Sequence, residues 1–369
     1  MTELIFILTD FCAPAVGEIA MMEQARAAIL PRLPALETLL ARGHHESLPH
    51  DWRAWLAARL DVAPLAPAAT VAAAWSAGDN DDAAGADADA GAQPAPYHHW
   101  LATPVHFFAG IDRIQLHPAG LLQLPTAEQH TLAGEFAQVF GDSPWRLKAR
   151  GARELLLAGP PLYASGLDPA GFAGDDPTGG LPQGPDAAAL KRLGSEIELW
   201  LHEHPLNLER TRRGELAIST LWLWGGQIVP ATATAPAVAA ALATPPICAM
   251  PPHPVGPLST RLFGRDTYAE ALWRLHGASA QPLPRSLAAG PALMDGPADS
   301  VLLYPMRHDG SVTAALAQLE QHWLTGAAAA LRRRRIEAVQ LVIGSSAYRL
   351  RWRDLGRLWR ARAPWWEKM

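Results

Sequence analysis

The sequence contains little cysteine, and its first residues do not have the pattern of a secretory signal. Cys12 and Cys248 are its two cysteines, which are too few for a disulfide scaffold and have no zinc-binding spacing. The first apolar run, Leu4–Leu8, follows an acidic residue and is shorter than the core of a signal peptide. These absences favour a cytoplasmic protein whose thiols stay reduced.

Charge is absent from Leu216 to Thr260, so a membrane span has to be considered there. A spanning helix needs roughly 20 consecutive, strongly apolar residues. This stretch is instead rich in alanine and threonine and is broken repeatedly by proline, from Pro230 to Pro254. We therefore expect no membrane partner and interpret residues 229–257 as a Pro/Ala-rich loop.

The remaining composition is that of a globular protein, with 18% charged and 49% hydrophobic residues among 369. From Arg332 onward there are eleven basic residues against three acidic ones, a net charge of +8, so the rest of the chain carries −13. This basic C-terminal segment indicates either an anionic partner or an intramolecular match to the acidic body. Its arginines interleave with tryptophans, a pattern that can follow phosphates and stack on bases.

Residues 76–96 consist mainly of small residues and include five aspartates, which predicts a disordered acidic linker. We accordingly expect an N-terminal α/β part at 1–75 that contributes the first strand. The main α/β region is expected at 97–369, and it includes the Pro/Ala-rich loop and the basic C-terminal segment.

Strands and helices alternate along the predicted pattern. Apolar runs predict strands at Leu4–Thr9, Thr220–Trp224, Ser300–Pro305 and Ala338–Ile343, and a hairpin joining Trp145–Arg150 to Glu154–Ala158. Helical spacing predicts helices at Leu36–Arg42, after a capping Asp186, between Asp266 and Gly277, and from 311 towards 335. This alternation is typical of an α/β fold with a mostly parallel central sheet flanked by helices.

The segment 202–226 concentrates histidine, arginine and tryptophan. Because Pro205 disfavours helical backbone in the residue before it, a helix should end at His204. Asn207 should cap the short helical turn that follows, which carries Arg210 and Arg213.

Two tryptophans then occupy one strand. Trp222 and Trp224 are two residues apart, so their side chains should share a face, and Gly225 permits a positive φ or a close approach. The block is either the rim of an anion-binding cleft or a buried tryptophan pair beside a solvated arginine face. In the first interpretation, the residues that bind the anion or ligand are His204, Asn207, Arg210, Arg213, Trp222, Trp224 and Gly225.

This block resembles the archaeal-type branch of cofactor-independent phosphoglycerate mutase, in the alkaline-phosphatase-like superfamily. The matching positions are His204, Pro205, Asn207, Arg210, Gly214, Trp222, Trp224 and Gly225, whereas Thr220 departs from an asparagine of the family. The chain is still more similar to a bacterial family labelled "regulatory protein, RpfE type", on this block and on Thr103-Pro104-x-His106, Gly110-Ile111-Asp112 and the predicted hairpin. The resemblance covers residues 97–226 best, the N-terminal part more weakly and the C-terminal third in outline, and it implies an alkaline-phosphatase-like fold.

The resemblance implies two divalent metal ions, Mn²⁺ or Mg²⁺, held by Asp and His side chains, and a Ser or Thr nucleophile. Asp10 follows the first strand, where the first ligand is expected, but the glycine expected after it is replaced. His308 and Asp309 stand where a larger ligand cluster is expected, and residues 344–346 read Gly-Ser-Ser where an Asp-His pair is expected. The one nucleophile candidate, Ser47, lacks the expected context.

A metal site needs its full ligand set, so we expect the site to be degenerate, with Asp10, His308 and Asp309 as vestiges. This predicts a protein without a bound cofactor or an identifiable catalytic residue. It would act in a regulatory or ligand-binding role, and its partner would be a small anion or a regulatory protein. The alternatives are an active metal-dependent phosphoglycerate mutase or phosphatase with an atypical site, and nucleic-acid binding through the basic C-terminal segment.

Overall fold

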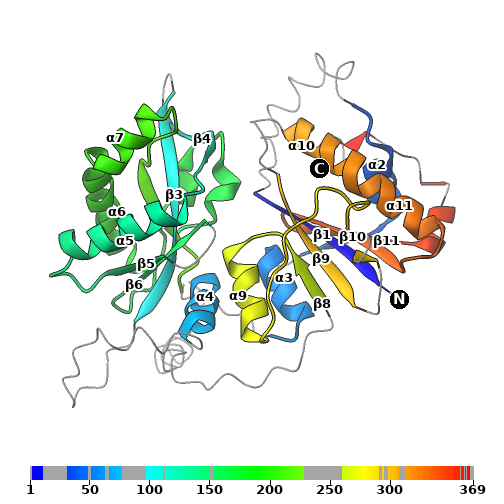
Figure 1. Cartoon of the computed structure of the whole chain (residues 1–369), viewed down its shortest axis with the longest axis horizontal. Helices are drawn as coiled ribbons and strands as arrows, with labels where there is room; N and C mark the ends of the chain where they lie inside the picture. The colour runs from blue at the N-terminus through cyan, green and yellow to red at the C-terminus, as the bar shows by residue number, and fades with distance from the viewer. Residues whose placement is uncertain are drawn as a thin grey trace. The chain divides into compact units, whose positions relative to one another are not determined.

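The computed structural model describes residues 2–10, 31–48, 51–62, 66–76, 97–110, 113–149, 153–227, 260–290, 293–294, 298–306, 312–357, 359–360, 362 and 364–365. The chain divides into two compact units (Figure 1). The first unit comprises Met1–Ala63, Pro257–Arg265 and Ser279–Met369. The second unit comprises Pro64–Gly256 and Asp266–Ala278.

These boundaries differ from the expected ones. The two ends of the chain share one unit because the first strand pairs with strands near the C-terminus. Helix α4 (Pro67–Ser76), expected within the N-terminal part, packs instead against α9 (Thr267–Leu275) in the second unit. Residues 77–96 and 228–259, which hold most of the expected linker and all of the expected loop, lie outside the described residues.

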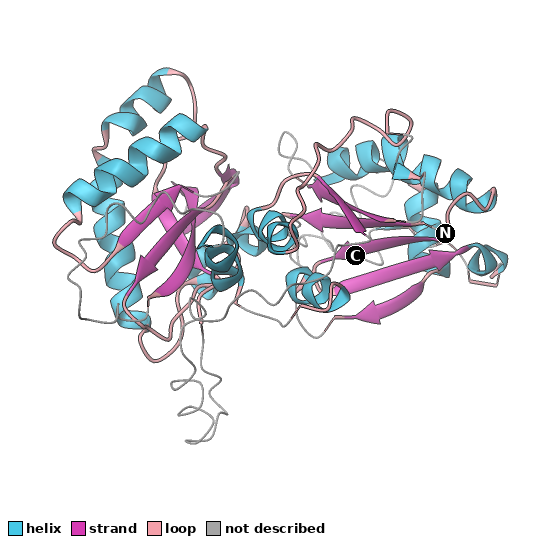
Figure 2. Cartoon of the chain, turned by 60° about the horizontal axis from the view of Figure 1, so that its bottom comes forward, coloured by secondary structure: helices cyan, strands magenta, loops and turns pink. Residues whose placement is uncertain are grey.

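The first unit is built on a six-stranded sheet with helices on both faces (Figure 2). In sheet order its strands are β2 (His44–Ser47), β11 (Ser346–Arg351), β10 (Ala338–Ile343), β1 (Glu3–Thr9), β9 (Asp299–Pro305) and β8 (Thr260–Phe263). The four strands from β10 to β8 are parallel, and β11 and β2 extend the sheet antiparallel. All seven residues of β1 are buried, as expected of a central parallel strand covered on both faces.

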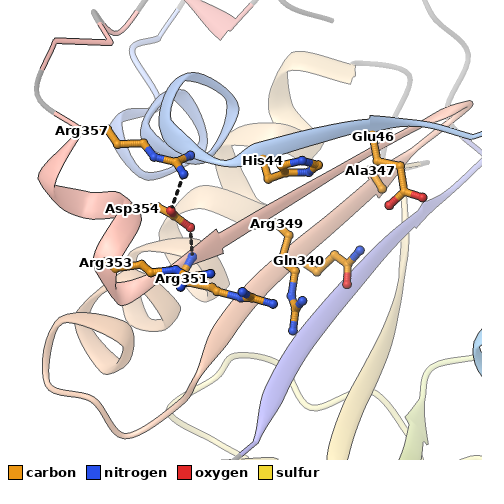
Figure 3. Close-up of a pocket in the computed structure, with 9 residues that line it drawn as sticks. All are labelled: His44, Glu46, Gln340, Ala347, Arg349, Arg351, Arg353, Asp354 and Arg357. Atoms are coloured by element: carbon orange, nitrogen blue, oxygen red, sulfur yellow. Dashed lines mark hydrogen bonds and ion pairs between the residues drawn. The ribbon is translucent and has the colours of Figure 1, made fainter.

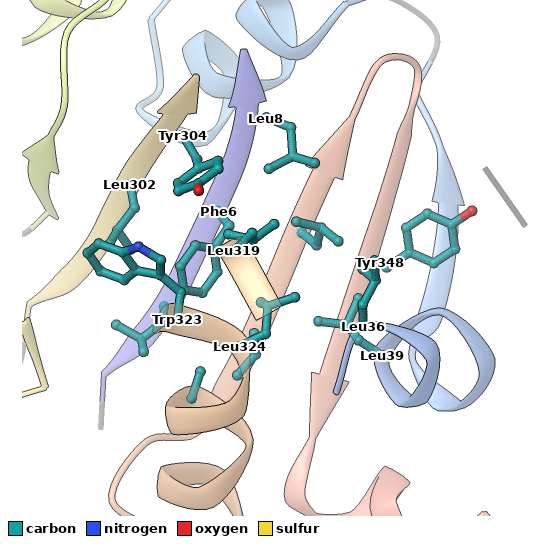
Figure 4. Packing of buried hydrophobic residues seen from close by; sticks show 14 of the residues in the cluster. Phe6, Leu8, Leu36, Leu39, Leu302, Tyr304, Leu319, Trp323, Leu324 and Tyr348 are labelled. Carbon is teal, nitrogen blue, oxygen red and sulfur yellow. The ribbon is translucent and has the colours of Figure 1, made fainter. Parts of the chain in front are cut away.

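One face of this sheet carries the main core of the first unit (Figure 4). Phe6 of β1 and Leu302 of β9 pack there, and the ring centroids of Phe6 and Trp323 lie 6.1 Å apart in an edge-on contact. The covering helices are α2 (Pro34–Arg42), α10 (Val312–Leu319), a π-helical turn η6 (Glu320–Leu324) and α11 (Thr325–Arg332). The long helix expected from 311 towards 335 is therefore interrupted by a π-turn and ends at Arg332.

Glu320 of the π-turn ties this helix to α2. Its carboxylate accepts hydrogen bonds from the backbone N–H groups of Ala35 (2.7 Å) and Leu36 (2.9 Å), at the start of α2. Since Leu33 gives α2 no side-chain cap, Glu320 satisfies donors that would otherwise be left unpaired. Among its described residues the unit also contains helix α3 (Trp52–Arg59), capped by Asp51, and the 3₁₀ turn η7 (Trp352–Gly356).

The second unit contains an entirely antiparallel sheet. Its strands are β4 (Ile114–Leu121), β3 (His98–Ala109), β6 (Leu155–Gly159) and β5 (Arg146–Ala149), with β7 (Thr220–Trp224) also paired to β3. Its other elements are α4, α9, α5 (Thr126–Val139), α6 (Ala187–His202), α7 (Pro205–Arg212) and the 3₁₀ turns η2 (Pro169–Phe172) and η3 (Pro177–Gly180).

Helix α6 buries the four predicted apolar residues, Leu190, Leu193, Ile197 and Leu201. Asp186 occupies the predicted N-cap position of this helix, but its side chain makes no capping hydrogen bond. Its carboxylate instead accepts a hydrogen bond from the Tyr163 N–H at 2.8 Å. That bond fixes the preceding loop.

The predicted α/β class with a mostly parallel central sheet flanked by helices is confirmed by the first unit. The antiparallel second sheet was not anticipated. Within the described residues, no helix combines the length and the hydropathy needed to cross a bilayer.

Candidate functional site

His204 lies at the junction of α6 and α7, in the block that carries the resemblance. Its Nδ1 accepts a hydrogen bond from the Leu206 N–H at 3.2 Å, which makes it the N-cap of α7. Its Nε2 lies 2.6 Å from the carboxylate of Glu135. This contact is close enough for an ion pair but lacks hydrogen-bond geometry, so Nε2 of this buried imidazole has no hydrogen-bond partner among the described residues.

Asn207 is not the cap that its sequence position predicted. Because His204 caps α7 and Pro205 opens it, Asn207 falls inside the first turn. Its Nδ2 donates to the carbonyls of Leu201 (2.7 Å) and Ile218 (2.8 Å), and its Oδ1 accepts from the Ile218 N–H (2.7 Å). One buried amide thus fastens the end of α6 to the segment entering β7.

Arg210 and Arg213 converge on one carboxylate of α5. Arg210 Nη1 lies 2.6 Å from Glu128 Oε2, and Arg213 Nη2 donates to Glu128 Oε1. The exposed fractions of the Arg210 and Glu128 side chains are 6% and 9%, so this pair is largely desolvated. Arg213 also pairs with Glu215, whose hydrogen bond is the main cause of the raised pKa of Arg213.

Trp222 and Trp224 share one face of β7, as predicted, and both are buried. Trp222 Nε1 donates to the Leu167 carbonyl and Trp224 Nε1 donates to Thr103 Oγ1, each at 2.8 Å. Gly225 has the expected positive φ, +70°, and its close neighbour is Pro67. These indoles therefore point into packed protein.

The structure places all seven predicted residues in the second unit and bonds or packs each of them internally. It does not gather them at one site, because Trp222 and Trp224 pack in one core cluster whereas α5, α6 and α7 cover another. The geometry is that of a clamp joining α5, α6, α7 and β7. An anion pocket at these residues stays a prediction that the described contacts do not favour.

The carboxyl ends of β9, β1 and β10 meet at one edge of the first sheet. Thr9 pairs with Pro305 and Leu8 pairs with Ile343, so Asp10 follows β1 beside the residues that leave β9 and β10. Asp10 adopts a positive φ of 58°. His308 and Asp309 lie outside the described residues, as do residues 307–311 generally.

The connection after β10 does not contain the Asp-His pair of metal ligands that the resemblance implies. Ile343 pairs with Ser346 of β11 across a two-residue turn, Gly344-Ser345, in which Gly344 has φ +52°. The nucleophile candidate Ser47 lies on β2, with His44 and His45, in a strand and not at a helix end. Among the described residues, no group of three or more His, Cys, Asp or Glu side chains is arranged to hold a metal ion.

A cavity of about 360 Å³ lies on the first unit, at the antiparallel margin of its sheet (Figure 3). It is rich in arginine and lined by His44, Glu46, Gln340, Ala347, Arg349, Arg351, Arg353, Asp354 and Arg357. We call it the arginine pocket. Our sequence prediction treated these arginines as part of a basic segment, although the alternation of Arg349 and Arg351 with Tyr348 and Leu350 could have shown that they share a sheet face.

Much of the basic C-terminal segment is bound to the body of the first unit. The Arg334 guanidinium lies 3.8 Å from the ring centroid of Trp352. Arg357 donates to the Arg42 carbonyl at 3.2 Å, and Arg360 donates to the Gly43 carbonyl at 3.4 Å. These contacts support the intramolecular interpretation, and nucleic-acid binding stays a prediction.

No protein-family profile matches the sequence. No curated protein matches it either. Among solved structures, the chain is similar to cofactor-independent phosphoglycerate mutase from Thermoplasma acidophilum, with 14% identity over 95% of this chain and 89% of that one and a TM-score of 0.36. It is also similar to a protein from Pyrococcus horikoshii, with 10% identity over 95% and 87% of the two chains and a TM-score of 0.37. Likeness at this level carries no information on activity.

Proposed function

We propose that this chain is a phosphoglycerate-mutase-like protein that has lost two-metal phosphoryl transfer and acts in a ligand-binding or regulatory role. The observation that carries the proposal is the tight β10–β11 hairpin. In open α/β sheets, ligands bind beyond the carboxyl ends of the parallel strands. The resemblance places an Asp-His ligand pair after the last of these strands.

The short connection of this hairpin supports the loss of that pair. Gly344 and Ser345 form the whole connection, and Ser346 is already paired in β11. None of the three carries a carboxylate or an imidazole, the donors that this metal chemistry needs. A longer loop would be required to bring such side chains over the sheet edge next to Asp10.

The clamp of the second unit gives independent support. A block that resembles an enzyme family can persist because it holds helices together. His204, Asn207 and Arg210 do so here through contacts with Glu135, Ile218 and Glu128. Retention of the block therefore does not require retention of the chemistry.

Turnover of purified protein tests the proposal. Phosphoglycerate and a chromogenic phosphomonoester are supplied with Mn²⁺ or Mg²⁺, beside the Asp10→Asn variant and an authentic cofactor-independent mutase as a positive control. We expect no turnover above that of Asp10→Asn and no stoichiometric metal in the purified protein. Metal-dependent turnover that is lost in Asp10→Asn would establish the alternative, an active enzyme with an atypical site.

A further inference from the structure

The arginine pocket offers a binding site built from residues of three adjacent strands. Gln340 of β10 pairs in register with Arg349 of β11, and Arg349 pairs with His44 of β2. These three residues form one row across the sheet. Arg351 lies two residues along β11, so its side chain projects from the same face (Figure 3). The opposite face of β11 carries Tyr348 and Leu350, which belong to the core.

Three residues that line this pocket each carry a buried polar atom that has no hydrogen-bond partner among the described residues. These atoms are Nε of Arg349, Nε of Arg351 and Oε1 of Gln340. Gln340 is only 4% exposed. Buried polar groups in folded proteins are nearly always paired, and an unpaired one costs free energy. All three atoms belong to residues that line one cavity, so a ligand bound there is a candidate partner for these side chains.

The charges of the pocket are also unbalanced. Its lining holds four arginines and two carboxylates, a net charge of +2. Asp354 is already engaged by Arg357 Nη2 (2.9 Å) and by the Arg351 backbone N–H (2.9 Å). No ion pair joins Arg351 or Arg353 to a carboxylate in the part of the chain that the structure describes.

Arg349 has one carboxylate partner, Glu3, which it shares with Arg59. Burial lowers the pKa of Arg349, and the positive charges of Arg351 and Arg353 lower it further, against the opposing effect of Asp354. Three guanidinium groups thus repel one another around a space that is large enough for a small molecule.

We propose that the arginine pocket binds a small oxyanion, a phosphate or phosphomonoester group held by Arg349 and Arg351, with Gln340 accepting a hydrogen bond from the ligand. Guanidinium groups bind tetrahedral and planar oxyanions through paired, charge-assisted hydrogen bonds. A cavity of about 360 Å³ holds more than the oxyanion alone, so an organic group bearing a hydroxyl donor fits beside Gln340. The inference rests on the proposed ligand-binding role and assigns a site to it.

Glu46 provides a second test of anion binding in the arginine pocket. Its side chain lies on β2, is exposed, and lines the same pocket. A carboxylate there opposes an incoming anion, so its neutralisation should strengthen binding. A purely structural role of the arginines would not produce that effect.

Calorimetric titration of the full chain with inorganic phosphate tests the site, at fixed ionic strength maintained with chloride. The variants are Arg351→Gln and Arg349→Lys, which keep most of the fold contacts, together with Glu46→Gln. Arg333→Gln is the matched control, since Arg333 is exposed and lies outside the pocket. Glycerol phosphate and citrate, titrated in parallel, distinguish a phosphomonoester from free phosphate and from a carboxylate ligand.

We expect Arg351→Gln to weaken phosphate binding at least tenfold, about 1.4 kcal/mol, Arg349→Lys to weaken it less, and Glu46→Gln to strengthen it. Arg333→Gln should change the affinity less than twofold. Absence of saturable binding of phosphate and of both organic anions to the unaltered chain overturns the inference, as does equal binding by Arg351→Gln. Turnover and metal content test the proposed function and are measured separately from this titration. Enzymatic activity would therefore contradict the proposed function without changing the result for the arginine pocket.

Discussion

Replacement of Arg210 by methionine removes the most buried cation of the clamp in the second unit while keeping a side chain of similar length. The guanidinium loses its hydrogen bonds to Glu128 at 2.6 Å and to the Leu216 carbonyl at 2.9 Å, and its ion pair with Glu215 at 3.3 Å. Breaking a buried ion pair by removing one partner costs about 3–5 kcal/mol. Because Arg213 still donates to Glu128, that carboxylate keeps one partner, and we expect a loss of about 3 kcal/mol.

Arg212→Met is the matched control. Arg212 is on the same helix, its side chain is 75% exposed, and its ion pair with Glu209 spans 3.6 Å. An exposed pair contributes about 0–1 kcal/mol, so this variant should unfold nearly as the parent does. Comparison of the two changes removes any general effect of losing one positive charge.

The assay is urea denaturation combined with hydrogen-exchange mass spectrometry, so that peptides covering α5, α7 and β7 are measured separately from the first unit. Arg210→Met should lower the protection of these peptides and leave peptides of β1 and β10 unchanged. If Arg210→Met and Arg212→Met lose the same small amount of stability, the clamp interpretation is refuted. If Arg210→Met also lost phosphate binding, that result would instead support the predicted anion pocket at residues 202–226.

Three further changes test other parts of the fold. Asn207→Ala should cost about 2–3 kcal/mol in urea denaturation, because the N–H and carbonyl of Ile218 lose the buried amide that pairs with them; a loss under 1 kcal/mol would contradict its fastening role. Burial raises the pKa of Glu320 above its ordinary value of 4.5, so the folded state favours its protonated form, and this contribution is lost as pH rises through the folded-state pKa. Urea stability of the parent should therefore fall relative to Glu320→Gln from about pH 4 upward, and parallel pH profiles would argue against this assignment. Gly264→Ala should destabilise the first unit by about 1–3 kcal/mol, because φ is +105° and a methyl group would lie 2.6 Å from the Leu303 carbonyl oxygen; an unchanged thermal midpoint would be inconsistent with that geometry.

The elements themselves could be predicted from the sequence where a pattern is local. The apolar run of β1, the spacing of Leu190 to Leu201 in α6 and the shared face of Trp222 and Trp224 depend only on residues close together in the chain. Each was predicted, and the structure confirms each. The spacing of apolar residues along a helix or strand indicates which of its side chains are buried, so these features can be predicted from local sequence.

Contacts between residues that are far apart in the sequence could not be predicted from such local patterns. The arginines of α7 were equally consistent with a solvated face until Glu128, on another helix, was placed beside them. Asn207 was predicted as a cap because of its residue type, whereas the preceding His204 occupies that position. The antiparallel second sheet and the arginine pocket likewise depend on strand order, which a hydrophobic pattern does not specify.

The central position of β1 has a consequence for biosynthesis. Glu3 pairs with Ala338 on one side and β1 pairs with β9 on the other, so β1 needs neighbouring strands that are synthesised much later than itself. At roughly 5–20 residues per second, β1 leaves the ribosome tens of seconds before its partners exist. Its apolar side chains must be shielded during that interval. We therefore expect chaperones to bind β1 during translation more than the β3–β6 region, whose strands can pair soon after they emerge.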